Sequence, residues 1–221
     1  LGILALLEQA GRDPKNLQAQ DFGFVLGPRI NAAGRMDNMR IGIECLLADD
    51  WATAQRLAQE LEQLNRTRRQ VEGEMRAQAD SIVQALAAAD TSIEANADAE
   101  KSDDIIVQHK LEKKTANNRS IILYQDDWHQ GVIGIVAGRL KESHYLPSIV
   151  FAPADTERTG DNDAIKGSAR SIAGVHIRDA IEQVAESYPD LISHFGGHAM
   201  AAGLTLKRGN FDAFVTAFNA V

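Results

Sequence analysis

The sequence has 221 residues, of which 44% are hydrophobic and 24% charged, and its formal net charge at pH 7 is −8. No run of eighteen apolar residues occurs, so no membrane-spanning helix is expected. The acidic balance argues against bulk electrostatic binding of nucleic acid. Six of the acidic side chains fall within residues 90–104, however, so the average charge does not describe every surface.

The chain opens on Leu1 within a helical apolar pattern, without a basic flank or a cleavage site. We therefore expect no signal peptide and interpret the sequence as a segment of a longer protein. The one cysteine, Cys45, lies among apolar residues. It predicts a core thiol in a reducing cytoplasm, with a catalytic cysteine as the alternative.

Residues 1–50 predict a helix, a loop and then the motif Gly-Pro-Arg-Ile-Asn-Ala-Ala-Gly-Arg-Met-Asp at 27–37. Pro28 fixes its own φ and biases Gly27 toward an extended conformation. Arg29 would then present a planar guanidinium suited to a phosphate. The alternative is a tight turn held by Arg–Asp pairs.

A long helix is predicted over 51–88, because apolar side chains recur there at helical spacing. At 1.5 Å per residue such a helix spans roughly 50 Å, so we expect it to connect two bodies. The alternative is a coiled coil used for dimerisation. The apolar stripe consists of Leu57, Leu61, Leu64, Val71, Met75, Ile82 and Leu86.

Residues 89–118 have few large apolar side chains and predict a linker or surface insertion, with a short ordered stretch at 105–107. Residues 119–221 alternate short apolar runs with helical patterns, which predicts an α/β domain with a mixed sheet flanked by helices. The expected strands are 120–124, 148–151, 164–170, 191–195 and 204–206, and the expected helices are 131–141, 176–186 and one after residue 210.

Trp-His-Gln-Gly-Val-Ile-Gly at 128–134 leads into the first of these helices. Its glycines would let the helix lie flush on a sheet or on DNA, and a helix N-terminus offers free N–H groups to an anion. His129 could contact a phosphate there. The alternative is that His129 and Gln130 merely cap the helix. A metal role for His129 is not supported, because no second ligand lies at a suitable spacing.

Lys-Gly-Ser-Ala-Arg-Ser at 166–171 predicts a phosphate pocket. In a strand, Ser168 and Arg170 point to the same face, and Ser171 adds a second hydroxyl. The glycine spacing of a nucleotide P-loop is absent. The alternative is a polar strand end with Arg170 in an ion pair.

His-Phe-Gly-Gly-His-Ala-Met-Ala-Ala-Gly at 194–203 contains two adjacent glycines. Gly196 and Gly197 predict a loop that a ligand approaches closely. His198 can donate to a phosphate or stack on a base, with a purely structural histidine as the alternative.

In this order, these four motifs resemble those of bacterial RecJ, a family of single-strand-specific 5′→3′ DNA exonucleases in the DHH phosphoesterase superfamily. The resemblance covers nearly the whole chain apart from 89–118. It implies that residues 1–50 are the end of the DHH phosphoesterase domain, itself α/β, and that 51–88 are a connector. Residues 119–221 would then be the DHH-associated nucleic-acid-binding domain, whose cleft with the first domain holds single-stranded DNA.

The resemblance also implies a role in DNA repair and recombination, with Mn²⁺ or Mg²⁺ in the full-length enzyme, since a metal pair activates water and offsets charge. The family's Asp-His-His motif does not occur in this sequence. We therefore expect this segment to bind no metal and to be inactive alone. The expected partners are single-stranded DNA with a 5′ end, a single-strand-binding protein and a helicase, in the cytoplasm and without a membrane.

Residue roles follow from the same resemblance. Arg29 would contact the DNA phosphate near the catalytic centre. Ser168 and Arg170 would belong to the 5′-phosphate pocket, with Ser171 counted among the substrate-binding residues. The strand-binding loop and the rest of the groove would be formed by Gly196, Gly197, His198, His129 and Gln130.

Two other functions are alternatives. One is a phosphodiesterase of the same superfamily that acts on short oligonucleotides or cyclic dinucleotides, against which the long connector argues. The other is a pure nucleic-acid-binding module, like the related domain of alanyl-tRNA synthetases. The Gly-Pro-Arg motif argues against that module.

Overall fold

The computed structural model describes residues 1–95, 119–154 and 163–221, with side chains up to residue 88 in the first range. The chain divides into two compact units, Leu1–Gly73 and Glu74–Val221. Helix α5 (Trp51–Ala95) contributes to both. Most of the predicted insertion at 89–118 lies outside the described residues.

The first unit, residues 1–73, consists of helices joined by short turns and contains no strand. Its core contains fully buried side chains from α1, α4 and α5, among them Leu6 and Cys45. Burial raises the pKa of the Cys45 thiol, as expected for a core cysteine. The elements are α1 (Gly2–Gln9), η1 (Pro14–Asn16), α2 (Ala19–Asp21), η2 (Phe22–Leu26), α3 (Gly27–Met36), α4 (Arg40–Leu47) and the first part of α5.

The Gly-Pro-Arg motif is helical, so the predicted extended conformation of Gly27 was wrong. Gly27 has φ −53° and ψ −47°, and its N–H donates to the carbonyl of Phe22, five residues earlier. Pro28 lies in the first turn of α3, which continues directly from η2, and the fixed φ of proline is compatible with a helix. The π turn of η2 carries the chain into α3 without the extended residue that usually precedes a proline.

The predicted long helix is confirmed, and α5 is longer than expected at 45 residues. Asp50 caps its start, since the Thr53 N–H donates to Asp50 Oδ1 at 2.8 Å. Hydrogen bonding by Thr53 also lowers the pKa of the Asp50 carboxyl. The predicted apolar stripe is buried at Leu57 and Leu61 in the first unit and at Met75 in the second.

The second unit contains a five-stranded mixed sheet, which confirms the predicted α/β fold. The strand order is β1-β2-β3-β5-β4, with β1 and β2 parallel and the other neighbouring pairs antiparallel. The strands are β1 (Ile121–Tyr124), β2 (Ser148–Pro153), β3 (Ala164–Arg170), β4 (His194–His198) and β5 (Ala201–Lys207).

The strand expected at 191–195 begins later, at His194. Leu191 instead belongs to a turn, because its N–H donates to the carbonyl of Tyr188 at 3.0 Å. Leu191 and Ile192 are apolar because this turn packs against the core, and they do not belong to the strand.

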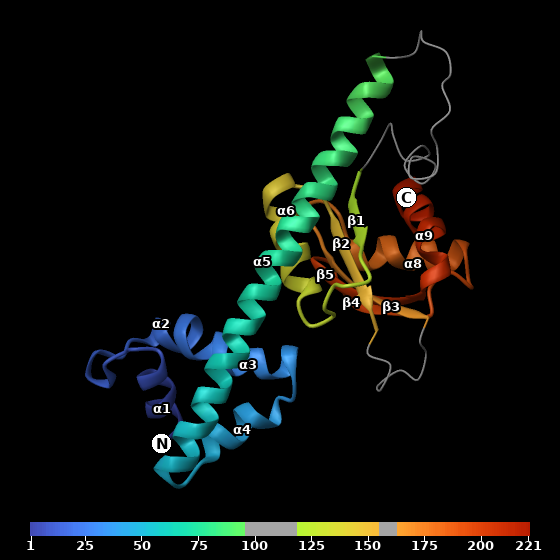
Figure 1. Cartoon of the computed structure of the whole chain (residues 1–221). Helices are drawn as coiled ribbons and strands as arrows, with labels where there is room; N and C mark the ends of the chain where they lie inside the picture. Colours follow the sequence, from blue (N-terminus) through green and yellow to red (C-terminus); the bar gives the residue numbers. More distant parts are fainter. Residues whose placement is uncertain (96–118, 155–162) are drawn as a thin grey trace. The chain divides into compact units, whose positions relative to one another are not determined.

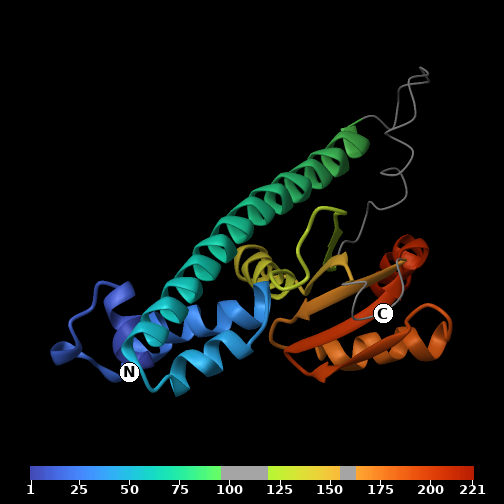
Figure 2. The same ribbon diagram turned by 60° about the horizontal axis from the view of Figure 1, so that its bottom comes forward.

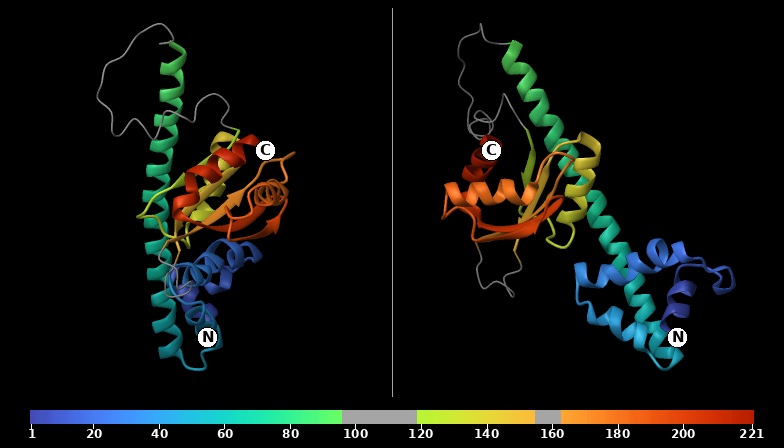
Figure 3. Two further views of the ribbon diagram at one scale, coloured as in Figure 1. Left: turned by 90° about the vertical axis from the view of Figure 1, so that its right-hand side faces the viewer. Right: turned by 180° about the vertical axis from the view of Figure 1, so that it is seen from behind.

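Helices cover both faces of the sheet. Helix α6 (Ile133–His144) lies on one face, and α8 (Ile177–Ser187) and α9 (Phe211–Ala220) lie on the other, as Figures 1 and 3 show. A short helix η4 (Arg208–Asn210) precedes α9. Figure 2 shows α8 running alongside β4 and β5. None of the helices in the described ranges is both long enough and apolar enough to cross a membrane.

The face under α8 and α9 carries a large apolar core. Phe151 of β2 is fully buried and packs edge to face against Phe211 and Phe214. Gly167 of β3 lies opposite Phe151 in the register, and its missing side chain leaves room for the ring.

We predict that Gly167→Ala destabilises the second unit. A Cβ at this position would lie 2.4 Å from Phe151 Cε1 and 2.7 Å from Leu204 Cδ2. Overpacking of this kind costs about 1–3 kcal/mol of the free energy of unfolding, measured by chemical denaturation. The control is Gly209→Ala, whose Cβ would meet nothing within 4 Å. Equal stability of the two variants would contradict the packing described here.

Candidate nucleic-acid interface

Alternation along the strands places a set of polar and small residues on the sheet face that bears α6. Residues directly opposite each other in neighbouring strands share a face. The register aligns Ser168 of β3 with Gly203 of β5 and Gly196 of β4. It likewise aligns Arg170 with Ala201 and His198. Two predicted motifs that are far apart in sequence therefore meet on one face.

The first turn of α6 lies directly against Ser168 and Arg170. A Cβ on Gly134 would be 2.9 Å from both Arg170 Nη2 and Ser168 Oγ. Arg170 Nη1 donates to Ser168 Oγ at 3.0 Å and to the carbonyl of Ala169 at 2.8 Å. The start of α6 carries no side-chain cap. A guanidinium, a hydroxyl and a helix N-terminus thus converge, which is an arrangement that favours an anion.

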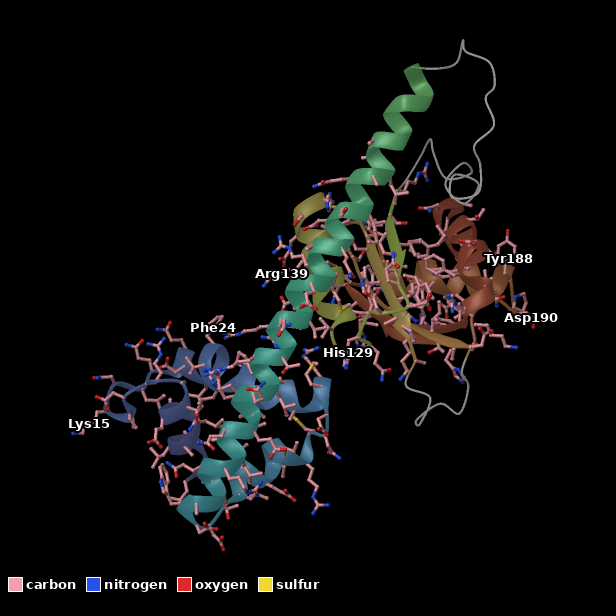
Figure 4. All side chains as sticks on the ribbon, in the orientation of Figure 1. Lys15, Phe24, His129, Arg139, Tyr188 and Asp190 are labelled. Carbon is pink, nitrogen blue, oxygen red and sulfur yellow. The ribbon has the colours of Figure 1, made fainter. Side chains whose placement is uncertain are left out.

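The segment before α6 is held in place by the second part of α5. The indole Nε1–H of buried Trp128 donates to Gln78 Oε1, and Gln78 Nε2 donates to Asp127 Oδ2 at 3.1 Å. His129 Nδ1 accepts from the Gly131 N–H at 3.0 Å. Figure 4 marks His129, which is half-buried like Gln130. His129 therefore caps a turn and, when neutral, keeps its proton on Nε2.

The paired glycines lie in a strand, which corrects the predicted loop. Gly196, Gly197 and His198 form the exposed end of β4, at the edge of the sheet. Gly197 has φ 154°, and a Cβ there would lie 2.4 Å from Ala202 Cα, so this glycine allows β4 to pair closely with β5. Gly196 faces open space, since a Cβ there would meet nothing within 4 Å.

Ser171 points away from this face. It is 1% exposed, and its hydroxyl donates to the carbonyl of Val175 at 2.6 Å. We therefore leave Ser171 out of the candidate interface. Two-residue alternation could have revealed this, because a residue next to Arg170 in a strand points to the opposite face.

Two residues that the sequence interpretation did not select lie on the interface face. Lys166 of β3 is aligned with Thr205 of β5 and His194 of β4. Lys166 shares the face of Ser168 and Arg170 by two-residue alternation, and His194 shares that of His198 in the same way. Both are the first residues of their motifs, and two-residue alternation from Ser168 and from His198 would have selected them.

The electrostatic character of these three strands differs from that of the whole chain. Strands β3, β4 and β5 contain no aspartate or glutamate, although the formal net charge of the chain is −8. Their charged or titratable residues are Lys166, Arg170, Lys207, His194 and His198. The acidic average thus conceals a locally cationic sheet face.

Arg29 lies in the first unit and is nearly buried. Its Nε is 2.6 Å from Glu62 Oε2 on α5, and its Nη1 donates to the carbonyl of Val25 at 2.6 Å. The Nε–Glu62 contact is an ion pair without hydrogen-bond alignment. Glu62 also pairs with Arg66. The structure thus gives Arg29 a structural partner, and its contact with a DNA phosphate stays a prediction.

A pair of catalytic divalent ions needs a cluster of carboxylate or imidazole ligands. Within the part of the chain that the structure describes, no group of three or more His, Cys, Asp or Glu side chains is arranged to hold a metal ion. The described residues therefore do not fit a two-metal centre.

Comparison with known families identifies the class of the second unit. Residues 117–221 match the family model of the DHHA1 domain, so this part of the chain is a DHHA1 domain.

The chain as a whole is RecJ-like. It is 44% identical over 218 residues to the single-stranded-DNA-specific exonuclease RecJ of Salmonella typhimurium, covering 98% of this chain and 32% of that protein. It is 43% identical to RecJ of Escherichia coli over 217 residues, with 98% and 32% covered. The chain therefore spans about a third of the length of these relatives.

Solved structures of RecJ also resemble this chain. The structure of RecJ from Thermus thermophilus in complex with Mn²⁺ matches with a TM-score of 0.69 and 29% identity, over 99% of this chain and 26% of that one. The same protein in complex with Mg²⁺ matches with a TM-score of 0.68 and 28% identity, over 99% and 28%.

We predict that Gly134→Ala leaves the fold intact but weakens binding of a 5′-phosphorylated oligonucleotide. The added methyl group meets only the ends of two side chains, which can move, and alanine favours a helix over glycine by about 0.5–1 kcal/mol. Moving Arg170 and Ser168 disrupts the anion site. Fluorescence anisotropy and thermal unfolding measure the two effects.

The control for this variant is Gly138→Ala, one turn further along α6, whose Cβ would meet nothing within 4 Å. It should bind like the unmodified chain. Equal affinities of the two alanine variants would show that the first turn of α6 is not part of the anion site.

We predict that Glu62→Gln lowers the free energy of unfolding of the first unit by about 3 kcal/mol, because it leaves the Arg29 charge buried without its partner. The control is Glu44→Gln, which removes an exposed pair with Arg40 and should cost less than about 1 kcal/mol. Chemical denaturation compares them, and a Glu62 variant as stable as the Glu44 variant would refute a structural role for the pair.

Proposed function

We propose that this chain binds single-stranded DNA at a 5′-phosphate end, as part of a metal-dependent 5′→3′ exodeoxyribonuclease. The observation that carries the proposal is the convergence of Ser168, Arg170 and the N-terminal turn of α6 on one side of the sheet. The names of the curated relatives, which are single-stranded-DNA-specific exonucleases, supply the substrate class.

The chemistry of a terminal phosphate suits this pocket. The Arg170 guanidinium would make charge-assisted hydrogen bonds to the phosphate oxygens. Ser168 Oγ already accepts from Arg170 Nη1, so its own O–H is available to donate to the ligand. The dipole and the uncapped N–H groups of α6 add attraction for the second negative charge of a terminal phosphate.

The rest of the strand would continue over β5 toward β4. Gly196 leaves open space at the edge of the sheet, and exposed His198 can donate to a phosphate or stack on a base. His129 and Gln130 border the same end of α6 and would line the groove. The role of Arg29 near the catalytic centre is proposed on the family resemblance.

Cleavage itself would depend on residues other than those described here. The Mn²⁺ and Mg²⁺ complexes are those of Thermus thermophilus RecJ, and the described residues of this chain present no comparable ligand cluster. We propose that the segment supplies substrate binding and is inactive alone. The whole protein would act in DNA repair and recombination in the cytoplasm, with a single-strand-binding protein and a helicase as partners.

We predict that the chain binds single-stranded DNA weakly and more weakly as salt rises, with a preference for a 5′-phosphate over a 5′-hydroxyl end. Arg170→Ala should remove that preference, because a lost hydrogen bond to a charged group costs on the order of 1.5–3 kcal/mol. Fluorescence anisotropy with two oligonucleotides that differ only at the 5′ end measures both effects.

The control is Arg178→Ala, which removes the same charge from α8 on the opposite face of the sheet. It should retain the end preference. If Arg170→Ala keeps the preference, the pocket is assigned wrongly. Tighter binding of blunt duplex than of single strands would refute the proposed substrate.

A further inference from the structure

Lys166 lies on the cationic sheet face but outside the 5′-phosphate pocket. It is half-buried in β3, two residues from Ser168 on the same face. Among the described residues it has no ion pair or side-chain hydrogen bond. A lysine on a strand that has no acidic partner among the described residues is positioned to bind an anionic ligand.

Lys166 and the exposed His194 lie at the two ends of a row of three residues that crosses three neighbouring strands. The register aligns Lys166, Thr205 and His194 in that order on β3, β5 and β4. Neighbouring strands are about 4.8 Å apart, so the two outer positions are separated by roughly 10 Å with Thr205 between them. A phosphate above Thr205 is within reach of both side chains.

Between this row and the 5′-phosphate pocket, the sheet surface carries only small side chains on β5. Along β5 the interface face presents Ala201, Gly203 and Thr205, and Gly203 is exposed. Lys166 is four residues from Arg170 in β3, which is about 13 Å along the strand. That distance is the reach of a short run of nucleotides, and no bulky side chain on β5 obstructs the path.

We infer that Lys166 and His194 form a second phosphate site for single-stranded DNA, internal to the strand and separate from the pocket for its 5′ end. The inference rests on the proposed function, which supplies the ligand. A charged ammonium and an imidazole N–H would hold an internal phosphodiester, while Ser168 and Arg170 hold the terminal phosphate. The second site therefore contributes affinity without discriminating between 5′ ends.

The test is fluorescence anisotropy of the 221-residue chain with 5′-phosphate and 5′-hydroxyl oligonucleotides at several salt concentrations. Lys166→Met should weaken binding of both oligonucleotides by the same factor, roughly tenfold. The slope of log affinity against log salt should fall in magnitude by about 0.7, the value for one lost phosphate contact on a single strand. His194→Gln should act in the same direction with a smaller effect.

Two further variants make the outcome decisive. Lys166→Arg keeps the charge and should retain affinity and salt slope, which separates a lost contact from a folding defect. Arg178→Met removes an equal charge from the opposite sheet face and should leave both quantities unchanged.

Oligonucleotide binding by the unmodified chain together with unchanged binding by Lys166→Met would overturn the second site alone. Loss of 5′-end preference in Lys166→Met would also overturn it, because the site would then be part of the terminal pocket. Failure of the unmodified chain to bind either oligonucleotide at any salt concentration would overturn the proposed function and the second site together.

Discussion

The close approach of α6 to β3 at Gly134 is the constraint on which the candidate interface depends. Only a residue without a side chain lets the first turn of the helix lie against Arg170 and Ser168, since a Cβ would be 2.9 Å from each. That contact brings the positive end of the helix dipole to a guanidinium and a hydroxyl that are already hydrogen-bonded to each other. The Trp128–Gln78 bond holds the entry to the same turn from the side of α5.

Because successive side chains along a strand point to opposite faces, the two faces of the sheet differ in composition. One face supplies Phe151, Leu204 and other buried side chains that pack under α8 and α9 and stabilise the second unit. The other face is occupied by α6 over β2 and β3, and it leaves polar and small residues of β5 and β4 uncovered. The α6 face has an apolar part of its own, where Val150 of β2 and Val136 and Leu140 of α6 are buried. The strands that α6 leaves uncovered contain no aspartate or glutamate, although the chain is acidic.

Much of the fold could be predicted from sequence. Apolar periodicity gave the long helix and the alternation of strands and helices, and two-residue alternation put Ser168 and Arg170 on one face. The helical conformation of Gly27 could not be predicted from the sequence, because a π turn depends on packing and has no local sequence signature. The strand at Gly196–His198 was missed for a similar reason: pairing with β5 overrides the weak strand propensity of glycine. Arg29 and Glu62 are 33 residues apart in the sequence. Their ion pair could not be predicted, because only the tertiary packing brings them together.

The most direct test of the account is a crystal structure of this chain with a short 5′-phosphorylated single strand. We expect the terminal phosphate between Arg170, Ser168 and the first turn of α6, with the strand continuing over β5 toward β4. A strand bound to the opposite face of the sheet, or a terminal phosphate held away from Arg170, would contradict it.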